Sequence, residues 1–129
     1  MIIDASALIA ILREEPEGAQ FQRAIAIADT RRISAATYVE TAIVIDAQRD
    51  AVASRRLDDL LLRAQVEVVP FTASQAAIAR DAYRAFGKGS GHPARLNFGD
   101  CLVYALAKET GEPMLFKGEE FARAGVDVA

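Results

Sequence analysis

The sequence predicts a single α/β domain over residues 1–129, in which a central parallel sheet of four to five short strands carries helices on both faces. The first observation is the length of 129 residues, which is typical of one compact domain. The second is the composition: 52% of the residues are hydrophobic and 26% are charged, which excludes a disordered chain. The third is that short β-branched runs alternate with helical stretches of about 10 to 15 residues, the pattern of strands joined by crossover helices.

The first strand and two helices are expected in the first 28 residues. Met1–Ile3 is a short β-favouring run, and the apolar stretch Ala7–Leu12 predicts a helix that Ser6 caps. Pro16 suits the first turn of a second helix over roughly residues 17–28. The chain therefore passes from a strand almost directly into a helix.

A second strand and two further helices follow. Residues 33–35 form a brief strand candidate, and Thr37 with Glu40 matches a capping box that predicts the start of a third helix. The apolar stripe of that helix is Val39, Ile43 and Ala47. Either Asp50 or Ser54 caps a fourth helix rich in leucine.

The remaining elements are marked by prolines, glycines and caps. Residues 66–71 are β-branched and contain Pro70, which is typical of a buried strand, and Thr72–Gln75 is a capping pattern for a fifth helix. The glycine-rich stretch 87–97 predicts an extended loop. The last expected elements are a helix from Asn97 to near Gly111, a strand at 114–116, a short helix at 119–123 and a last strand at 126–128.

Charge and composition exclude several classes of protein. The net charge of −3 excludes a basic protein that coats nucleic acid, so any contact with RNA needs a local basic patch. One cysteine and one histidine cannot build a zinc site of thiolates and imidazoles. The first residues lack a signal-peptide pattern, and no apolar run approaches the roughly 20 residues of a membrane span. We therefore expect a cytoplasmic protein without membrane contact.

Acidic residues follow the predicted strands. Asp4 ends the first strand, Glu40 and Asp100 lie in early helical turns, and Glu119 with Glu120 follows the strand at 114–116. The carboxyl ends of parallel strands meet in one crevice, where unneutralised carboxylates would repel each other. A hard divalent cation such as Mg²⁺ or Mn²⁺, completed by substrate phosphate, is the natural partner of such a set.

Each acid also has a structural explanation. Glu40 could complete the capping box of Thr37, Asp100 could pair with a cap at Asn97, and Glu119 and Glu120 suit the positive end of a helix dipole. Asp4 is expected to gain little from capping, which favours a functional role. The joint pattern is more specific than any one of its members.

The motifs together resemble those of the PIN-domain family and, more narrowly, the VapC toxins of bacterial toxin–antitoxin systems. The residues that carry the resemblance are MIIDASAL at 1–8, Glu40, FGKG at 86–89, His92-Pro93, LNFGDC at 96–101 and LFKG at 115–118. Nearly the whole chain is covered, and the order and spacing of the motifs are specific.

The resemblance implies a ribonuclease that depends on Mg²⁺ or Mn²⁺, cuts cellular RNA and so arrests growth. Asp4 and Asp100 correspond to the principal metal ligands, and Glu40 to a third acid. Ser6, Asn97 and Glu120 are expected to support them. The implied partners are a cognate VapB-type antitoxin and a second copy of the chain, with DNA contacted only indirectly through the antitoxin.

The fourth acid departs from the family pattern. Many relatives carry Asp in a Gly-x-Asp-Phe stretch, where this chain reads Gly118-Glu119-Glu120-Phe121. We favour Glu119 as the catalytic group, because it directly follows Gly118 at the strand end.

The residues expected to contact RNA phosphates are Lys88, Arg95 and Lys117. The position of His92 before a proline in a glycine-rich loop favours a role in forming the loop over one as a general base. Cys101 is expected to be a small buried apolar residue.

Three rival functions remain to be weighed. A haloacid-dehalogenase-like phosphatase needs a second Asp two residues after Asp4, where this chain has Ser6. A receiver-like binding module needs paired acids after the first strand and an acceptor Asp after a central strand, and neither is present. A non-catalytic PIN-like association domain is disfavoured by the retained acids, although Glu120 leaves it open.

Overall fold

The computed structural model describes residues 1–129 and contains a four-stranded parallel sheet in the order β3-β2-β1-β4. The strands are β1 (Ile2–Ile3), β2 (Arg32–Ser34), β3 (Glu67–Val69) and β4 (Met114–Leu115). The helices are α1 (Ala5–Leu12), α2 (Gly18–Ile27), α3 (Ala35–Asp46), α4 (Ala51–Arg63), α5 (Ala73–Phe86), α6 (Phe98–Thr110) and α7 (Glu120–Arg123). Because β1 pairs with both β2 and β4, the first strand of the chain is central.

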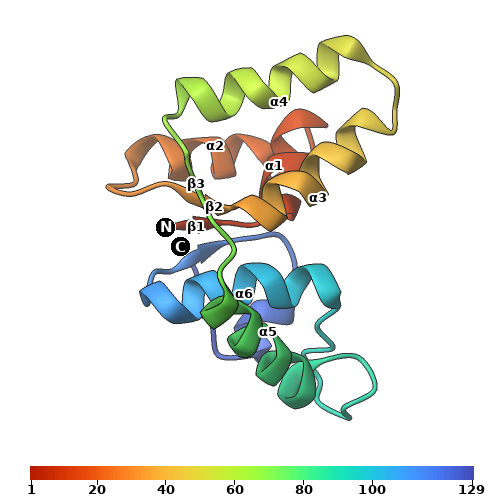
Figure 1. Ribbon diagram of the computed structural model, residues 1–129. Helices are drawn as coiled ribbons and strands as arrows, with labels where there is room; N and C mark the ends of the chain where they lie inside the picture. Colours follow the sequence, from red (N-terminus) through yellow and green to blue (C-terminus); the bar gives the residue numbers. More distant parts are fainter.

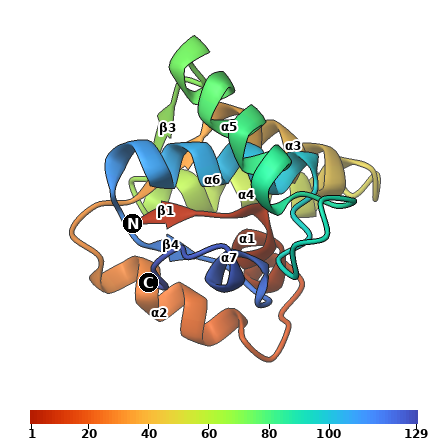
Figure 2. The same ribbon diagram turned by 90° about the horizontal axis from the view of Figure 1, so that it is seen from below.

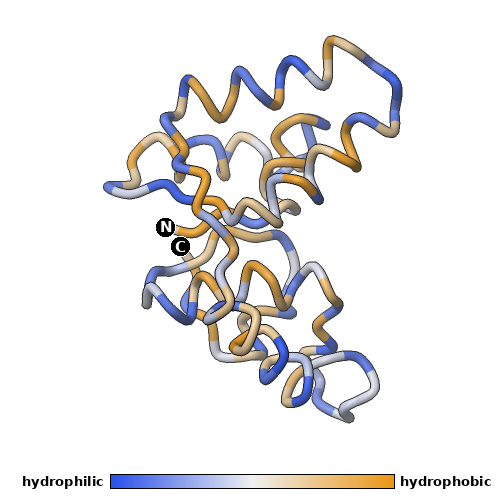
Figure 3. Tube along the Cα trace, in the orientation of Figure 1, coloured by the Kyte–Doolittle hydropathy of each residue, from blue (hydrophilic) through white to orange (hydrophobic).

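Helices cover both faces of the sheet, which confirms the predicted α/β class (Figure 1). On one face α1 to α4 enclose a core that includes Ile3, Leu8 and Leu57. On the other face α5, α6 and α7 enclose a second core that includes Leu106 and Phe121. In Figure 3 the hydrophobic residues concentrate where the chain passes through the strands, while the outer turns of the helices are hydrophilic. None of the helices has the length and apolar character that a bilayer crossing requires.

Two predicted helix starts are wrong. Helix α1 begins at Ala5 and its cap is Asp4, whose side chain accepts a hydrogen bond from the backbone N–H of Ser6. Helix α3 begins at Ala35, directly after β2, and its cap is Ser34. In both cases the helix begins directly from a polar residue at the strand end, Asp4 just after β1 and Ser34 as the last residue of β2, so no linker residues remain for the caps that the pattern predicted.

The polarity of two segments also differs from the prediction. The predicted stripe of α3 faces outward, with Val39 52% and Ile43 63% exposed, whereas Thr37, Thr41 and Ile45 face the core. The stripe is therefore one face of the helix, but that face is turned toward solvent. The strand β3 lies at the edge of the sheet, so it is largely exposed rather than buried.

The elements from residue 50 onward agree better with the sequence prediction. Asp50 caps α4, Thr72 caps α5, and Asn97 caps α6, which ends at Gly111 in a left-handed conformation. The last expected strand is reduced to one bridge between Val128 and Met114. In Figure 2 the end of β1, the start of α1, the start of α6 and the 87–97 loop lie on the same side of the molecule.

Candidate acidic active site

Asp4 is buried at the end of β1 and is held by its own helix. Its Oδ2 accepts hydrogen bonds from the backbone N–H of Ser6 at 3.0 Å and from the Ser6 hydroxyl at 2.6 Å. The hydroxyl of Ser6 in turn accepts from the backbone N–H of Lys117 at 2.9 Å, which ties β1 to the end of β4. The expectation that Asp4 gains little from capping is therefore wrong. Burial raises the pKa of Asp4, against the effect of the Ser6 hydrogen bonds.

Asp100 completes a reciprocal capping box at the start of α6. Its Oδ2 accepts from the backbone N–H of Asn97 at 2.9 Å, and the Asn97 side chain accepts from the Asp100 N–H at 2.8 Å. Burial raises the pKa of Asp100, and the charges of Asp4 and Glu120 raise it further. The backbone of Asn97 and the ammonium of Lys88 oppose this effect. The structural explanation for Asp100 is thus correct, and it leaves the Oδ1 of this side chain without a protein donor.

Glu40 lies inside α3 and takes no part in a helix cap, so the structural explanation for this residue is wrong. Its carboxylate lies against Gly99, where an added Cβ would overlap the carboxylate oxygen. Partial burial raises the pKa of Glu40, and the charges of Asp4 and Asp100 raise it further. The bare backbone of Gly99 therefore provides the space through which Glu40 reaches the other acids.

The structure brings Glu120, rather than Glu119, to the other acids. The charge of Glu120 contributes to the raised pKa values of both Asp4 and Asp100. The carboxylate of Glu119 is 75% exposed and pairs with Arg123 one turn along α7. Gly118 has φ +108°, and a Cβ there would overlap the Glu120 carboxylate. This turn therefore directs the second glutamate of the pair toward the cluster.

The four acids Asp4, Glu40, Asp100 and Glu120 fit a hard cation by their chemistry. All donors are carboxylate oxygens, and burial, together with the charges of neighbouring acids, raises the pKa of Asp4, Glu40 and Asp100. Asp4 and Asp100 each use one oxygen in a cap and leave the other without a protein donor. No three such side chains converge closely enough to hold a cation by themselves, so water or substrate oxygens must complete a coordination shell.

Of the three residues expected to contact RNA phosphates, two lie in the 87–97 loop and the third is paired with glutamates. Lys88 lies close enough to Asp100 to lower its pKa, and Arg95 is exposed in the 87–97 loop with φ +51°. The ammonium of Lys117 instead pairs with Glu15 at 2.8 Å and with Glu17 at 3.5 Å. These two contacts hold the Lys117 side chain against the α1–α2 connection.

His92 and Cys101, the two other residues singled out in the sequence, each have a structural role. The Nδ1 of His92 accepts from the backbone N–H of Ala94 at 3.1 Å, and its ring packs edge-on against Phe86. Cys101 is buried, and burial raises its thiol pKa to about 11. Sequence reasoning missed Gly99, which leaves room for the Glu40 carboxylate, and Gly118, which leaves room for that of Glu120.

Comparison with known sequences identifies the family. A family model described as PIN domain matches residues 1–127. Ribonuclease VapC28 of Mycobacterium tuberculosis is 57% identical over 129 residues, which cover 100% of this chain and 97% of that protein. Ribonuclease VapC of Mycolicibacterium smegmatis is 51% identical over 121 residues, which cover 94% of this chain and 93% of that protein.

Two solved structures share the fold. VapC20 of Mycobacterium tuberculosis, described as a sarcin-ricin loop cleaving toxin, superposes with a TM-score of 0.76 at 19% identity over 99% of this chain and 97% of that one. FitAcB from Neisseria gonorrhoeae superposes with a TM-score of 0.68 at 20% identity, covering 99% and 96%. The matches along the full length establish that this chain belongs to the PIN-domain family and, within it, to the VapC ribonucleases.

Proposed function

We propose that this chain is a Mg²⁺- or Mn²⁺-dependent ribonuclease, the toxin of a bacterial toxin–antitoxin pair, which hydrolyses RNA phosphodiester bonds and so arrests growth. The observation that carries the proposal is the cluster of Asp4, Glu40, Asp100 and Glu120, drawn from four separate parts of the chain to one site. Membership in the VapC ribonuclease family supports the same activity. The alternative of a non-catalytic PIN-like domain does not explain why four mutually repelling carboxylates, of which that of Asp4 is buried, are kept together.

The residues of the site have distinct roles in this proposal. Asp4 and Asp100 hold the cation through the carboxylate oxygens that their caps leave free. Ser6 and Asn97 fix the orientation of these two carboxylates, as supporting hydrogen bonds do in other metal sites. When bound, Mg²⁺ or Mn²⁺ supplies charge that neutralises the acids and stabilises the extra negative charge of the phosphodiester transition state.

The two remaining acids orient the attacking water. Glu40 and Glu120 lie at the same cluster without a capping hydrogen bond of their own, so their oxygens are available to accept protons from water. The raised pKa of Glu40 makes its carboxylate the better proton acceptor for this step. Glu119, which pairs with Arg123, has no part in this step.

Substrate RNA is proposed to bind through its phosphates. Lys88 stands beside Asp100, and Arg95 lies in the same exposed loop. These cations provide a local positive region on a chain whose net charge is −3. Lys117, which the sequence suggested as a third phosphate contact, is already paired with two glutamates and is proposed instead to hold the loop after β4.

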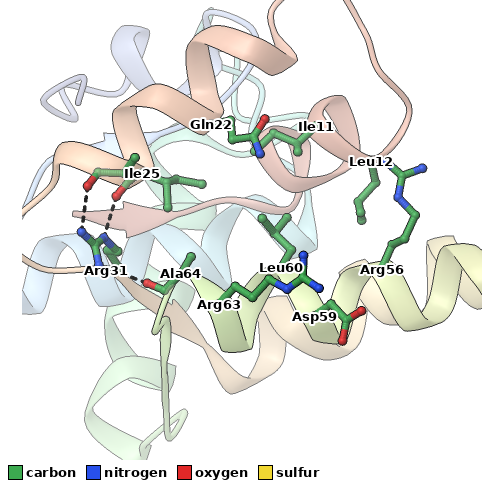
Figure 4. Close-up of a pocket in the computed structure, with 11 residues that line it drawn as sticks. Ile11, Leu12, Gln22, Ile25, Arg31, Arg56, Asp59, Leu60, Arg63 and Ala64 are labelled. Atoms are coloured by element: carbon green, nitrogen blue, oxygen red, sulfur yellow. Dashed lines mark hydrogen bonds between the residues drawn. The ribbon is translucent and has the colours of Figure 1, made fainter.

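The cognate VapB-type antitoxin is proposed to occupy a cavity of about 550 Å³ between α1, α2 and α4 (Figure 4). The aliphatic side chains of Ile11, Leu12 and Leu60 lie within it, and Arg56 and Arg63 line it from α4. Arg31 closes one end, where it donates to three backbone carbonyls. An antitoxin segment with aliphatic and acidic side chains complements this lining.

The assembly follows from the same proposal. The exposed Val39 and Ile43 of α3 give an apolar surface suited to a homodimer. We propose that the protein acts in the cytoplasm, where its RNA substrate lies, and that it contacts DNA only through the antitoxin.

Cleavage of end-labelled single-stranded RNA tests the function. The purified chain is expected to cleave with Mg²⁺ or Mn²⁺, to stop with EDTA and to recover when Mn²⁺ is restored in excess. Ca²⁺ should not support cleavage, because its larger and looser coordination misplaces the reacting groups. Full activity in EDTA contradicts the metal-dependent mechanism, and absence of cleavage with any metal or RNA favours the non-catalytic alternative.

A further inference from the structure

A small apolar hollow lies between α5 and α6, outside the acidic cluster. It has a volume of about 290 Å³, and seven of its eight lining residues are hydrophobic. Tyr83 of α5 and Phe98 of α6 line it while remaining 45% and 77% exposed. The two helices run side by side in both Figure 1 and Figure 2, so the hollow is built on rigid elements rather than on a loop.

The hollow lies next to the proposed catalytic site. Phe98 and Asp100 belong to the same first turn of α6, and Cys101, which lines the hollow, directly follows Asp100. Residues two apart in a helix lie on opposite flanks of a cylinder about 10–12 Å across. Phe98 therefore faces α5 while Asp100 faces the acids, at a separation that a few nucleotides of one RNA strand span.

The one charged side chain that lines the hollow is a cation. Arg80 lines it, and Arg84 lies one turn further along α5, on the way to Lys88. Exposed aromatic rings beside cations are the combination by which proteins bind single-stranded nucleic acid, because bases stack on the rings while the cations contact phosphates.

A second copy of this chain fits the hollow less well. A two-fold symmetric contact centred here would bring Arg80 close to the same arginine of the other copy, and like charges at an interface are unfavourable. The volume lies at the lower limit for small-ligand pockets, which suits one planar base.

We propose that Tyr83 and Phe98 form a stacking platform that holds one base of single-stranded RNA a few nucleotides from the phosphate to be cut. This inference rests on the ribonuclease function proposed above and adds the subsite that positions the strand. Arg80 and Arg84 contact the phosphates on either side of the stacked base.

A tryptophan reporter tests the contact directly, because the chain contains no tryptophan. The variant Phe98→Trp is titrated with a 12-nucleotide oligoadenylate in EDTA, which prevents cleavage. Stacking of adenine on the indole is expected to quench its fluorescence in a saturable manner. The matched control is Leu62→Trp, since Leu62 is 78% exposed on α4, away from the hollow. The control should show no saturable quenching.

Affinity measurements separate stacking from simple apolar contact. Phe98→Ala is expected to weaken binding of the same oligonucleotide by about 5- to 100-fold, the range for loss of one stacked base. Phe98→Leu should lose nearly as much, because it keeps apolar bulk but has no aromatic face, whereas Phe98→Tyr should bind like the wild type. An oligonucleotide that lacks one base should lose the same affinity only when it binds with the abasic position at Phe98.

Three outcomes overturn the inference. The first is wild-type affinity in Phe98→Ala and Phe98→Leu while RNA cleavage persists, which leaves the ribonuclease function intact. The second is a change of oligomeric state in light scattering without a change of RNA affinity, which assigns the hollow to a second copy. The third is a wild-type chain that neither binds nor cleaves RNA, which removes the ribonuclease function as well.

Discussion

Asp4 and Asp100 each perform two tasks with one carboxylate. One oxygen closes a helix cap and the other points away from any protein donor. The cap fixes the side chain without consuming both oxygens, so the orientation of each carboxylate is set before any ligand binds. At the scale of single residues, capping and proposed metal binding therefore reinforce each other instead of competing.

Replacement of Asp100 by Asn separates these two tasks. Asp100→Asn keeps an oxygen that can accept from Asn97 but removes the charge, so the helix cap should persist. We expect RNA cleavage to fall by more than about 100-fold, because even supporting residues of metal sites cost 10- to 100-fold. Circular dichroism should show an unchanged fold. Cleavage within a few-fold of wild type would contradict the assignment of Asp100.

The adjacent glutamates provide a matched pair. Glu120→Gln is expected to reduce turnover strongly, whereas Glu119→Gln should retain it, because only the Glu120 charge reaches Asp4 and Asp100. The measurement is single-turnover RNA cleavage at saturating Mn²⁺. The reverse order would restore the preference that the sequence alone suggested.

Gly99 is expected to be essential for an indirect reason. In Gly99→Ala the new Cβ overlaps the Glu40 carboxylate and displaces it, although alanine stabilises a helix by up to about 1 kcal/mol over glycine. Cleavage should therefore fall while the melting temperature does not. In a Glu40→Ala background the same change should have no further effect on cleavage. An equal loss in both backgrounds would show that Gly99 acts without Glu40.

The sequence predicts most of the acidic cluster but not its last member. Asp4 and Asp100 are marked by a strand end and by a capping pattern, both of which are local signals. The choice between Glu119 and Glu120 depends on the φ of +108° at Gly118, and a shift of one residue at such a turn redirects a side chain. No local pattern specifies which of two neighbouring glutamates faces a site built from distant residues.

At the scale of elements, an ionic network joins the strands at their amino-terminal ends, whereas the acids lie toward their carboxyl-terminal ends. Glu112, which precedes β4, accepts from the amino group of Met1 at 2.8 Å and pairs with Arg32 of β2. Burial opposes ionisation of Glu112, but hydrogen bonds from Met1, Thr30 and Arg32 outweigh it and lower its pKa to about 2. The network thus links the starts of β1, β2 and β4, whose ladders are only a few residues long.

This network predicts an acid-sensitive contribution to stability. A carboxyl group whose pKa is lowered in the fold stabilises the protein at pH values above its ordinary pKa, which is 4.5 for Glu112. This contribution disappears as the pH falls from 4.5 toward the lowered pKa of about 2. The shift corresponds to roughly 3 kcal/mol at neutral pH. Glu112→Gln should therefore destabilise the protein in urea at pH 7 and flatten the stability profile between pH 5 and 3. An unchanged profile would show that the network contributes nothing.

The helix boundaries show why element-level prediction succeeded only in part. The sequence pattern placed caps at Ser6 and Thr37, while the true caps are Asp4 and Ser34. Several polar residues near each strand end qualify as caps, and the sheet decides among them by fixing where the chain must leave the strand. Asn97 had no such competitor, and its cap was predicted correctly.

At the scale of the whole molecule, the acidic cluster costs stability. A carboxyl whose pKa is raised in the fold binds its proton more tightly there than in the unfolded chain, so stability falls as the pH rises through that raised pKa. Glu40→Gln should therefore raise the melting temperature of the metal-free protein at pH 7. Addition of Mn²⁺ should raise the melting temperature of the wild type more than the melting temperature of Asp100→Asn. Calorimetry in EDTA and in Mn²⁺ measures both effects, and a lower melting temperature for Glu40→Gln would contradict them.

The order of the chain also bears on synthesis. The central strand β1 pairs with β4 through Ile2 and Met114, and the acids of the proposed site come from positions 4, 40, 100 and 120. A polypeptide still being made on the ribosome cannot close this sheet until its last segments have emerged, because the pairing partner of its first strand does not yet exist. Incomplete chains that end before β4 therefore lack both the folded core and the fourth acid. A growing chain of this ribonuclease therefore acquires its complete sheet and all four acids only once synthesis has passed β4 and Glu120, however early Asp4 is made.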